Sequence, residues 1–218
     1  NFLPSISGNE SNHGTAMASV MVGGNTHFSG ISPLSEILSY RIIDQDGTTD
    51  THTVAHAIVD AVGAGADIIN LSLGGETGSH VLLQAVNFAR SQGVSVVAAV
   101  GNEGVGSINY PAAYDGVLGV SSIGKNGRVS VFSNYGNEVD ISAPGVGILT
   151  AWGDEEYVNF TGTSVSTAIV SAAIASELSR QPGLSAREVE QLLFDYANES
   201  EKPGFDVLAG HGILSLGR

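Results

Sequence analysis

The sequence contains no cysteine among its 218 residues. This absence excludes a disulfide framework, a thiolate nucleophile and any zinc site that uses cysteine ligands. It does not fix the redox compartment, because proteins of every compartment can do without cysteine.

Basic residues are also scarce, with 8 lysines and arginines against 22 acidic residues and a formal net charge of −14. Such a chain repels phosphate backbones and anionic lipid surfaces, so we expect neither nucleic acid nor a membrane as a partner. Charged residues make up only 14% and hydrophobic residues 42%, which excludes the composition of a disordered chain.

Long apolar runs are absent as well, and no stretch reaches the length of a membrane span. Residues 1–4 do not form the basic start of a signal peptide, and no apolar core follows them. We therefore expect that any targeting peptide has already been removed.

What is present suits one domain, since no linker or repeat divides the chain. We expect strands at residues 37–43, 67–73 and 94–100, because each is a short run rich in β-branched residues. Segments of helical period lie between them, at residues 54–62 and in a helix that Ser79 caps. This alternation predicts an α/β fold in three layers, with a mainly parallel sheet covered by helices on both faces.

The pattern changes after residue 116. Short strands at residues 117–123, 139–142, 148–152 and 157–161 are separated by glycine, asparagine and proline turns, which favours hairpins or meanders. Two helices follow, at about residues 164–180 and 185–197. The second begins with Ser185 and Glu188, which have the spacing of a capping box.

Three short segments each place one reactive group at the edge of a regular element. His13 opens a helix of small residues, Asn102 follows a buried strand, and Ser164 stands between a strand and a small-residue helix. Acyl transfer needs a base, a donor to the developing oxyanion and a nucleophile, and these three residue types can supply them. Taken singly, each also fits an ordinary structural role, as a surface histidine, a turn asparagine or a helix N-cap.

Taken together, the three segments resemble the signatures of the subtilisin-like serine proteases, or subtilases. The motifs are His-Gly-Thr at residues 13–15, Ala-Ala-Val-Gly-Asn at 98–102 and Gly-Thr-Ser at 162–164, in the family's order. Further matching segments lie at residues 46–49, 69–75, 110–112, 132–136, 142–145 and 210–214. The resemblance therefore runs over nearly the whole chain, and residues 1–218 are identified as one subtilisin-like peptidase domain.

The resemblance implies a serine endopeptidase of broad specificity, which cleaves polypeptides through an acyl-enzyme intermediate. It assigns His13 as the general base and Ser164 as the nucleophile. The Asn102 side chain and the Ser164 backbone N–H would form the oxyanion hole.

The resemblance also implies that a substrate binds as an added β-strand between two edges of the enzyme. The implied substrate-binding residues are Gly47, Thr48, Thr49, Ser72, Leu73, Gly74, Ala98, Ala99 and Gly101. No cofactor is required. Subtilases often bind structural calcium, although no run here has the ligand spacing of a calcium loop. Secretion, or another extracytoplasmic location, and a cis Tyr110-Pro111 peptide bond are further implications.

The chain departs from the family's order of aspartate, histidine and serine. Only twelve residues precede His13, and they include Glu10 but no aspartate. Loss of this carboxylate costs about 10⁴ in turnover in a serine protease, so we expect the chain alone to be inactive or weak. An upstream segment or a second chain would carry the aspartate, or a propeptide would be a partner. Because that segment would form a central strand, its absence predicts a hydrophobic slot.

Zinc and nucleotide binding each fit one feature of the sequence. His52 and His56 have the i, i+4 spacing of zinc ligands, but no glutamate base or third ligand accompanies them, so we expect solvent-facing histidines. A nucleotide-binding domain would need a glycine-rich phosphate loop. Neither residues 63–66 nor residues 101–104 complete one.

A pseudoprotease is the remaining alternative, in which a subtilase fold serves binding or regulation. The chain nevertheless retains the base, the oxyanion donor and the nucleophile. A protein relieved of catalysis has no chemical reason to keep all three, so the sequence favours the enzyme.

Overall fold

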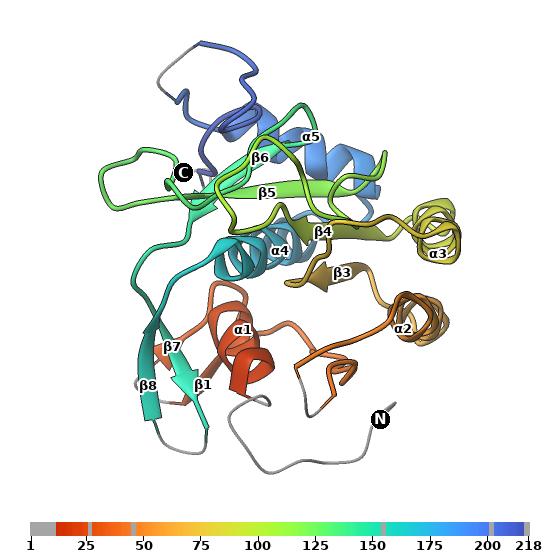
Figure 1. Cartoon of the computed structure of the whole chain (residues 1–218). Coiled ribbons are helices and arrows are strands. Elements are labelled where there is room, and N and C mark those ends of the chain that lie inside the picture. The colour runs from red at the N-terminus through yellow and green to blue at the C-terminus, as the bar shows by residue number, and fades with distance from the viewer. Residues whose placement is uncertain (1–11, 26–27, 45–46, 154–155, 201–202, 216–218) are drawn as a thin grey trace.

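The computed structural model describes residues 12–25, 28–44, 47–153, 156–200 and 203–215 (Figure 1). Its helices are α1 (Asn12–Val22), α2 (Thr51–Gly63), α3 (His80–Ser91), α4 (Thr163–Arg180) and α5 (Ala186–Tyr196). Its strands are β1 (Gly23–Asn25), β2 (Phe28–Ser29), β3 (Ile68–Leu71), β4 (Ser95–Ala99), β5 (Leu118–Ile123), β6 (Ile141–Pro144), β7 (Ile148–Trp152) and β8 (Glu156–Phe160). None of these helices combines the length and apolar character needed to cross a lipid bilayer.

The core of the fold is a parallel sheet in the order β3-β4-β5-β6. The expectation of a mainly parallel sheet is thereby confirmed. The expectation of hairpins after residue 116 was wrong for β5 and β6, which run parallel to β4. Residues 124–140 form a connection long enough to return the chain to the end of the sheet where β5 begins, as a parallel pair requires. Among the described strands after residue 116, β7 and β8 alone pair as the expected hairpin.

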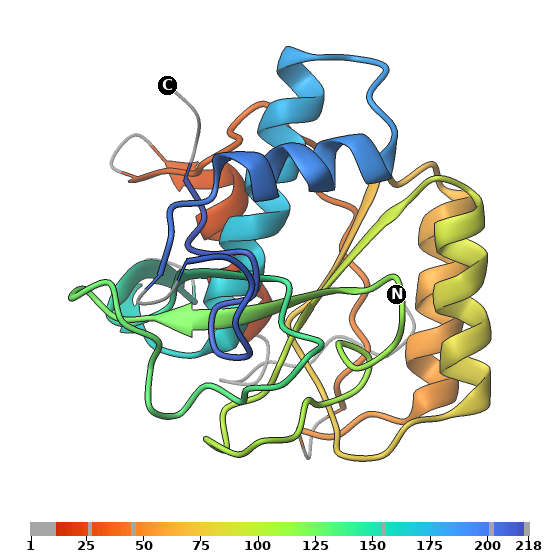
Figure 2. The same cartoon turned by 90° about the horizontal axis from the view of Figure 1, so that it is seen from above.

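Helices cover both faces of the sheet, as Figure 2 shows. Strand β4 demonstrates the two-sided burial, because its side chains alternate between two hydrophobic clusters. Val96 and Ala98 pack with α2 and α3, whereas Val97 packs with α1, α4 and α5. A strand buried on both faces reads as a continuous apolar run, which is why the sequence predicted it.

Residues 37–43 are not a strand, contrary to expectation. A β-strand exists only through its ladder with a neighbour, and no such ladder joins this segment to any described strand. Its apolar residues still pack, since Tyr40 and Ile42 contact the cluster beneath α2. The local sequence is therefore strand-like, but no described strand pairs with it.

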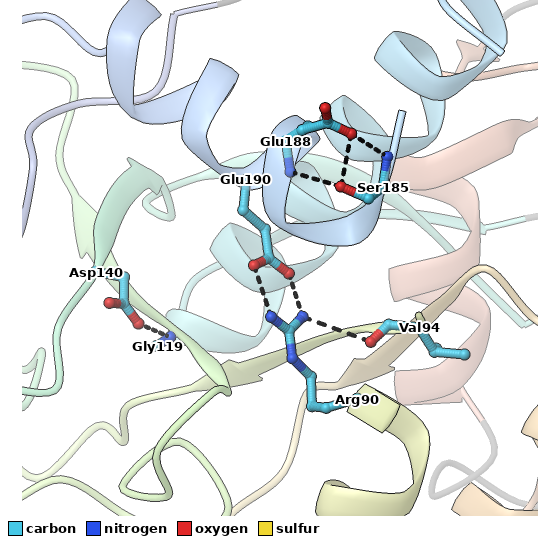
Figure 3. Close-up of polar contacts among 7 residues, drawn as sticks. All are labelled: Arg90, Val94, Gly119, Asp140, Ser185, Glu188 and Glu190. Carbon is cyan, nitrogen blue, oxygen red and sulfur yellow. Dashed lines mark hydrogen bonds and ion pairs between the residues drawn. The ribbon is translucent and has the colours of Figure 1, made fainter. Parts of the chain in front are cut away.

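Two sets of polar interactions stabilise the helices. The predicted capping box is confirmed: the Ser185 hydroxyl accepts from Glu188 N–H, and the Glu188 carboxylate accepts from Ser185 N–H (Figure 3). Arg90 of α3 donates two hydrogen bonds to Glu190 of α5, at 2.5 and 3.0 Å. This mostly buried ion pair joins helices from opposite faces of the sheet.

Candidate active site

The three predicted catalytic residues lie where regular elements begin or end. Asn102 follows β4, Ser164 is the second residue of α4, and His13 is the second residue of α1. Helices α1 and α4 pack against each other, and α4 also packs on β3 and β4. Ser164 contacts Ser72, which directly follows β3, and Asn102 follows β4, so Ser164 and Asn102 lie at the carboxyl end of the parallel strands.

Asn102 is oriented by Thr163, the neighbour of the candidate nucleophile. Its Oδ1 accepts from the Thr163 backbone N–H at 2.8 Å and from the Thr163 hydroxyl at 3.0 Å. Because both bonds use the oxygen, the amide nitrogen is left to act as a donor. This is the orientation that an oxyanion hole needs. The sequence analysis assigned no role to Thr163. Its position directly before Ser164 was the one feature that could have indicated a role in the site.

A carboxylate and two amides hold the loop that carries Asn102. Glu103 Oε2 accepts from the Asn102 backbone N–H at 3.0 Å, from Asn134 Nδ2 at 2.7 Å and from Asn109 Nδ2 at 3.2 Å. Asn134 Oδ1 in turn accepts from the backbone N–H groups of Glu103 and Val105. Sequence analysis matched residues 132–136 to the family but missed this role, because the bonding partners are about thirty positions apart.

Gly101 makes this arrangement sterically possible. Its φ is +115°, a conformation that residues with side chains rarely adopt. A Cβ at this position would also collide with the side chains of Glu103, Asn109 and Asn134. The predicted substrate-binding role of Gly101 stays a prediction, and its structural role is to let the network close around it.

Ser164 exchanges two hydrogen bonds with the segment after β3. Its Oγ donates to the Ser72 carbonyl at 3.3 Å, and the Ser72 hydroxyl donates to the Ser164 carbonyl at 2.8 Å. Asn70 extends the chain of bonds, since its amide donates to Ser72 Oγ and accepts from Ser171 Oγ. The strand therefore holds the start of α4 at two levels.

His13 lies against the edge of Phe160, with ring centroids 5.5 Å apart. Burial lowers the pKa of His13 below its usual range, and no carboxylate of the described residues offsets this effect. Within the described chain, no hydrogen bond joins His13 to Ser164, whose hydroxyl is directed at Ser72 instead. Glu10, the acidic residue before His13, lies outside the described residues.

The predicted substrate-binding residues fall into three places. Gly47 and Thr48 form a tight turn, in which the Thr48 N–H donates to the Asp44 carboxylate at 3.0 Å, and Thr49 follows it. Ser72, Leu73 and Gly74 leave β3 partly or fully exposed, whereas Ala98 and Ala99 are buried within β4. The structure brings Ser72 to Ser164, and the binding roles of the nine residues stay predictions.

The remaining candidate features are ordinary. His52 and His56 are both exposed on α2, as expected of solvent-facing histidines. No group of three acidic or histidine side chains suited to a metal occurs among the described residues. The Tyr110-Pro111 peptide bond is cis, which confirms that expectation.

Comparison with known proteins agrees with this geometry. The chain matches the model of the subtilase family over residues 3–212. Thermitase from Thermoactinomyces vulgaris is 37% identical over 199 residues, which cover 90% of this chain and 71% of that protein. A thermostable alkaline protease from Halalkalibacterium halodurans is 35% identical over 208 residues, covering 94% of this chain.

The chain spans only 57% of that alkaline protease. Among solved structures, sphericase superposes with a TM-score of 0.88 at 28% identity, and the alignment covers 94% of this chain and 78% of that one. Fold, motif order and similarity along almost the whole sequence coincide. This chain belongs to the subtilase family of serine proteases.

Proposed function

We propose that this chain is the catalytic domain of a serine endopeptidase of broad specificity. The observation that supports this most directly is the hydrogen bonding of Asn102 to Thr163, the residue that directly precedes Ser164. Asn102 is fixed with its donor nitrogen available, and the adjacent Ser164 stands at the N-terminus of an 18-residue helix. Backbone N–H groups and the helix dipole at such a terminus stabilise developing negative charge.

In this mechanism, Ser164 Oγ attacks the carbonyl carbon of the scissile peptide bond and His13 takes its proton. The resulting oxyanion accepts hydrogen bonds from Asn102 Nδ2 and the Ser164 N–H. The tetrahedral adduct collapses when His13 returns the proton to the leaving amine, which leaves an acyl ester on Ser164. Water then enters the same cycle and releases the second product.

We propose that the carboxylate partner of His13 is an aspartate carried by a segment outside the described residues, or by a second chain. Burial alone acts on His13, so its cationic form has no stabilising partner among the described groups. Without this partner the activity should be weak, because replacing the triad aspartate lowers kcat by about 10⁴ in a serine protease of another fold. From family membership alone, we propose an extracytoplasmic location, polypeptide substrates and calcium as a structural ion.

The test is active-site labelling with a fluorophosphonate, followed by mass mapping of the modified peptide. We expect slow labelling of the 218-residue chain at Ser164 only, and none in Ser164→Ala. Ser91→Ala is the matched control, because Ser91 presents an exposed hydroxyl on α3 and should leave labelling unchanged.

Labelling at a different serine would refute the assignment of the nucleophile. A total lack of reaction, even when an aspartate-bearing segment is restored, would favour the pseudoprotease alternative. One observation favours the pseudoprotease alternative: the Ser164 hydroxyl donates to the Ser72 carbonyl and not to His13.

A further inference from the structure

Asn126 is the only asparagine of the sequence that is followed by a glycine. The pair Asn126-Gly127 lies at the tip of the loop that follows β5, and both residues are exposed to solvent. At the base of this loop, Ile123 and Val129 form an antiparallel bridge. The proposed catalytic cycle makes no use of the Asn126 amide, so its chemistry can be considered by itself.

Hydrogen bonds within the loop define a tight turn. The Gly127 N–H donates to the Gly124 carbonyl at 3.0 Å, and the Gly124 N–H donates to the Arg128 carbonyl at 2.8 Å. Gly127 has a φ of +75°, and a Cβ added to it would meet no atom within 4 Å. Glycine therefore permits this turn, and it leaves the Gly127 backbone nitrogen without a side chain that could hinder its reactions.

The Asn126 side chain folds back over the backbone that follows it. Its Oδ1 accepts from the Arg128 N–H at 3.1 Å, which closes an Asx turn. This bond polarises the amide carbonyl of Asn126. When a nucleophile adds to Cγ, negative charge develops on Oδ1, and the Arg128 N–H already points at that atom.

The loop is also locally basic within an acidic chain. Lys125 and Arg128 flank the pair and are both exposed, and they are two of the 8 lysines and arginines of the sequence. Positive charges nearby favour the anionic form of a backbone nitrogen and the oxyanion that forms when it attacks. Since the loop is exposed, water can take part in the reaction.

We propose that Asn126 is a site of spontaneous deamidation, at which the chain converts to aspartate and isoaspartate. Hydroxide removes the proton of the Gly127 N–H, and the nitrogen attacks Cγ of Asn126. The N–Cγ bond forms, the Cγ–Nδ2 bond breaks, and the departing nitrogen takes a proton from water and leaves as ammonia. Water then opens the five-membered imide at either carbonyl. The proposal does not depend on the proposed peptidase function.

Both products change the loop. Each carries a new carboxylate between Lys125 and Arg128, so the chain becomes more acidic by one charge. Aspartate can keep the bond from the Arg128 N–H, because a carboxylate oxygen replaces Oδ1. Isoaspartate adds one atom to the main chain, which the turn bonds between Gly124 and Arg128 do not accommodate without a shift.

The test follows the full chain during a long incubation at mildly alkaline pH. Ser164→Ala is used as the background, so that self-cleavage cannot consume the sample. Peptide mapping by mass spectrometry should locate the mass increase of deamidation at Asn126, and anion exchange should separate a more acidic form. Protein isoaspartyl methyltransferase should label the same peptide. Both readouts are needed, because the exposed pair Asp115-Gly116 can form isoaspartate without a change in mass.

Asn137 is the internal control, since it is equally exposed but precedes Glu138. Its conversion should be slower than that of Asn126 by about 10-fold or more, because a side chain on the following residue hinders the attack. Asn126→Gln should abolish both signals in this peptide, because its longer side chain would have to form a larger ring. Gly127→Asn should keep the left-handed turn and slow the reaction by roughly 10-fold.

The same chain unfolded in urea provides the reference rate. Folding should slow the conversion of Asn126 by about 10- to 100-fold, since the bond from the Gly127 N–H to Gly124 must open first. The proposal fails if the folded chain shows no conversion at Asn126 after the unfolded chain has been converted there. Equal rates at Asn126 and Asn137 in the folded chain would also overturn it, because the loop would then confer no selectivity.

Discussion

Asn102 Oδ1 accepts hydrogen bonds from both the backbone N–H and the hydroxyl of Thr163, and this pair of bonds decides which way the amide faces. Thr163→Val keeps the shape and the backbone bond but removes the hydroxyl donor. Loss of the whole oxyanion donor costs about 10² to 10³ in kcat in subtilisin, where it was measured, so the partial loosening here should cost about 10-fold.

The decrease should appear in kcat while KM stays nearly constant, because the interaction develops in the transition state. Steady-state kinetics would measure this on the chain supplied with the aspartate-bearing segment proposed above. Thr167→Val on the same helix is the control, since its buried hydroxyl donates to the Thr163 carbonyl and makes no hydrogen bond to Asn102 among the described residues. An equal effect of both changes would mean a general disturbance of α4.

The Glu103 network should matter for activity through the position of Asn102. Glu103→Ala removes the acceptor shared by Asn109, Asn134 and the Asn102 N–H, so kcat should fall by about 10-fold or more. Glu103→Gln keeps one acceptor oxygen and should recover part of the loss. If Ala and Gln variants behave alike in kinetics, the carboxylate does not position the loop.

The labelling rate of Ser164 should decrease at acidic pH, because His13 must be neutral to accept the proton. The imidazole acts as a base only when neutral, and burial lowers its pKa below 6.5. For the chain alone, the labelling rate should therefore fall to half of its value at neutral pH only at a pH below 6.5. A carboxylate beside the ring would favour the imidazolium and raise the pKa, so the aspartate-bearing segment proposed above should move this limit upward.

Asp140 should make stability depend on pH in an unusual direction. Burial raises the pKa of its carboxyl from 3.8 to about 6, against the hydrogen bond that the Gly119 N–H donates to it. Because the folded state then binds more protons than the unfolded state between pH 4 and pH 6, this group destabilises the fold as pH rises through that window. The shift corresponds to about 3 kcal/mol at neutral pH.

Asp140→Asn keeps an acceptor for Gly119 and cannot ionise. Its Tm, measured relative to the parent chain, should therefore increase from pH 4 to pH 7. The exposed Asp60→Asn is the control and should show no such trend. A Tm difference that stays flat across this range for Asp140→Asn would contradict the raised pKa.

The Arg90–Glu190 pair should be costly to break singly and cheap to replace as a pair. Either Arg90→Met or Glu190→Leu leaves a mostly buried charge without its partner, at a cost of roughly 2 to 4 kcal/mol. The double variant removes both charges and should unfold closer to the parent than the sum of the two losses. Urea unfolding of the four proteins measures the coupling, and strict additivity would show that the two side chains do not interact.

Elements whose signals are local could be predicted from the sequence. The β7 strand was predicted with its exact bounds, and the α5 helix was predicted from its capping box. Both depend on neighbours within a few residues. The direction of β5 and β6 could not be predicted in this way, because a short apolar run does not specify which strand it will pair with.

The candidate site shows the same division. Short motifs identified His13, Asn102 and Ser164, since each carries its chemistry in its own side chain. The bond from Thr163 to Asn102 spans 61 positions and the bond from Ser72 to Ser164 spans 92. No local pattern encodes such distances, so the residues that orient the reactive groups became visible only in the fold.

The exchange of bonds between Ser72 and Ser164 has a consequence for ligand linkage. Ser72 directly follows β3 and forms two hydrogen bonds with Ser164, the residue expected to carry the acyl group. If a peptide bound along residues 72–74 changes the affinity of Ser164 for an inhibitor, thermodynamic reciprocity requires that the bound inhibitor change the affinity for the peptide by the same factor. One strand would thereby make the two binding equilibria a single cooperative system.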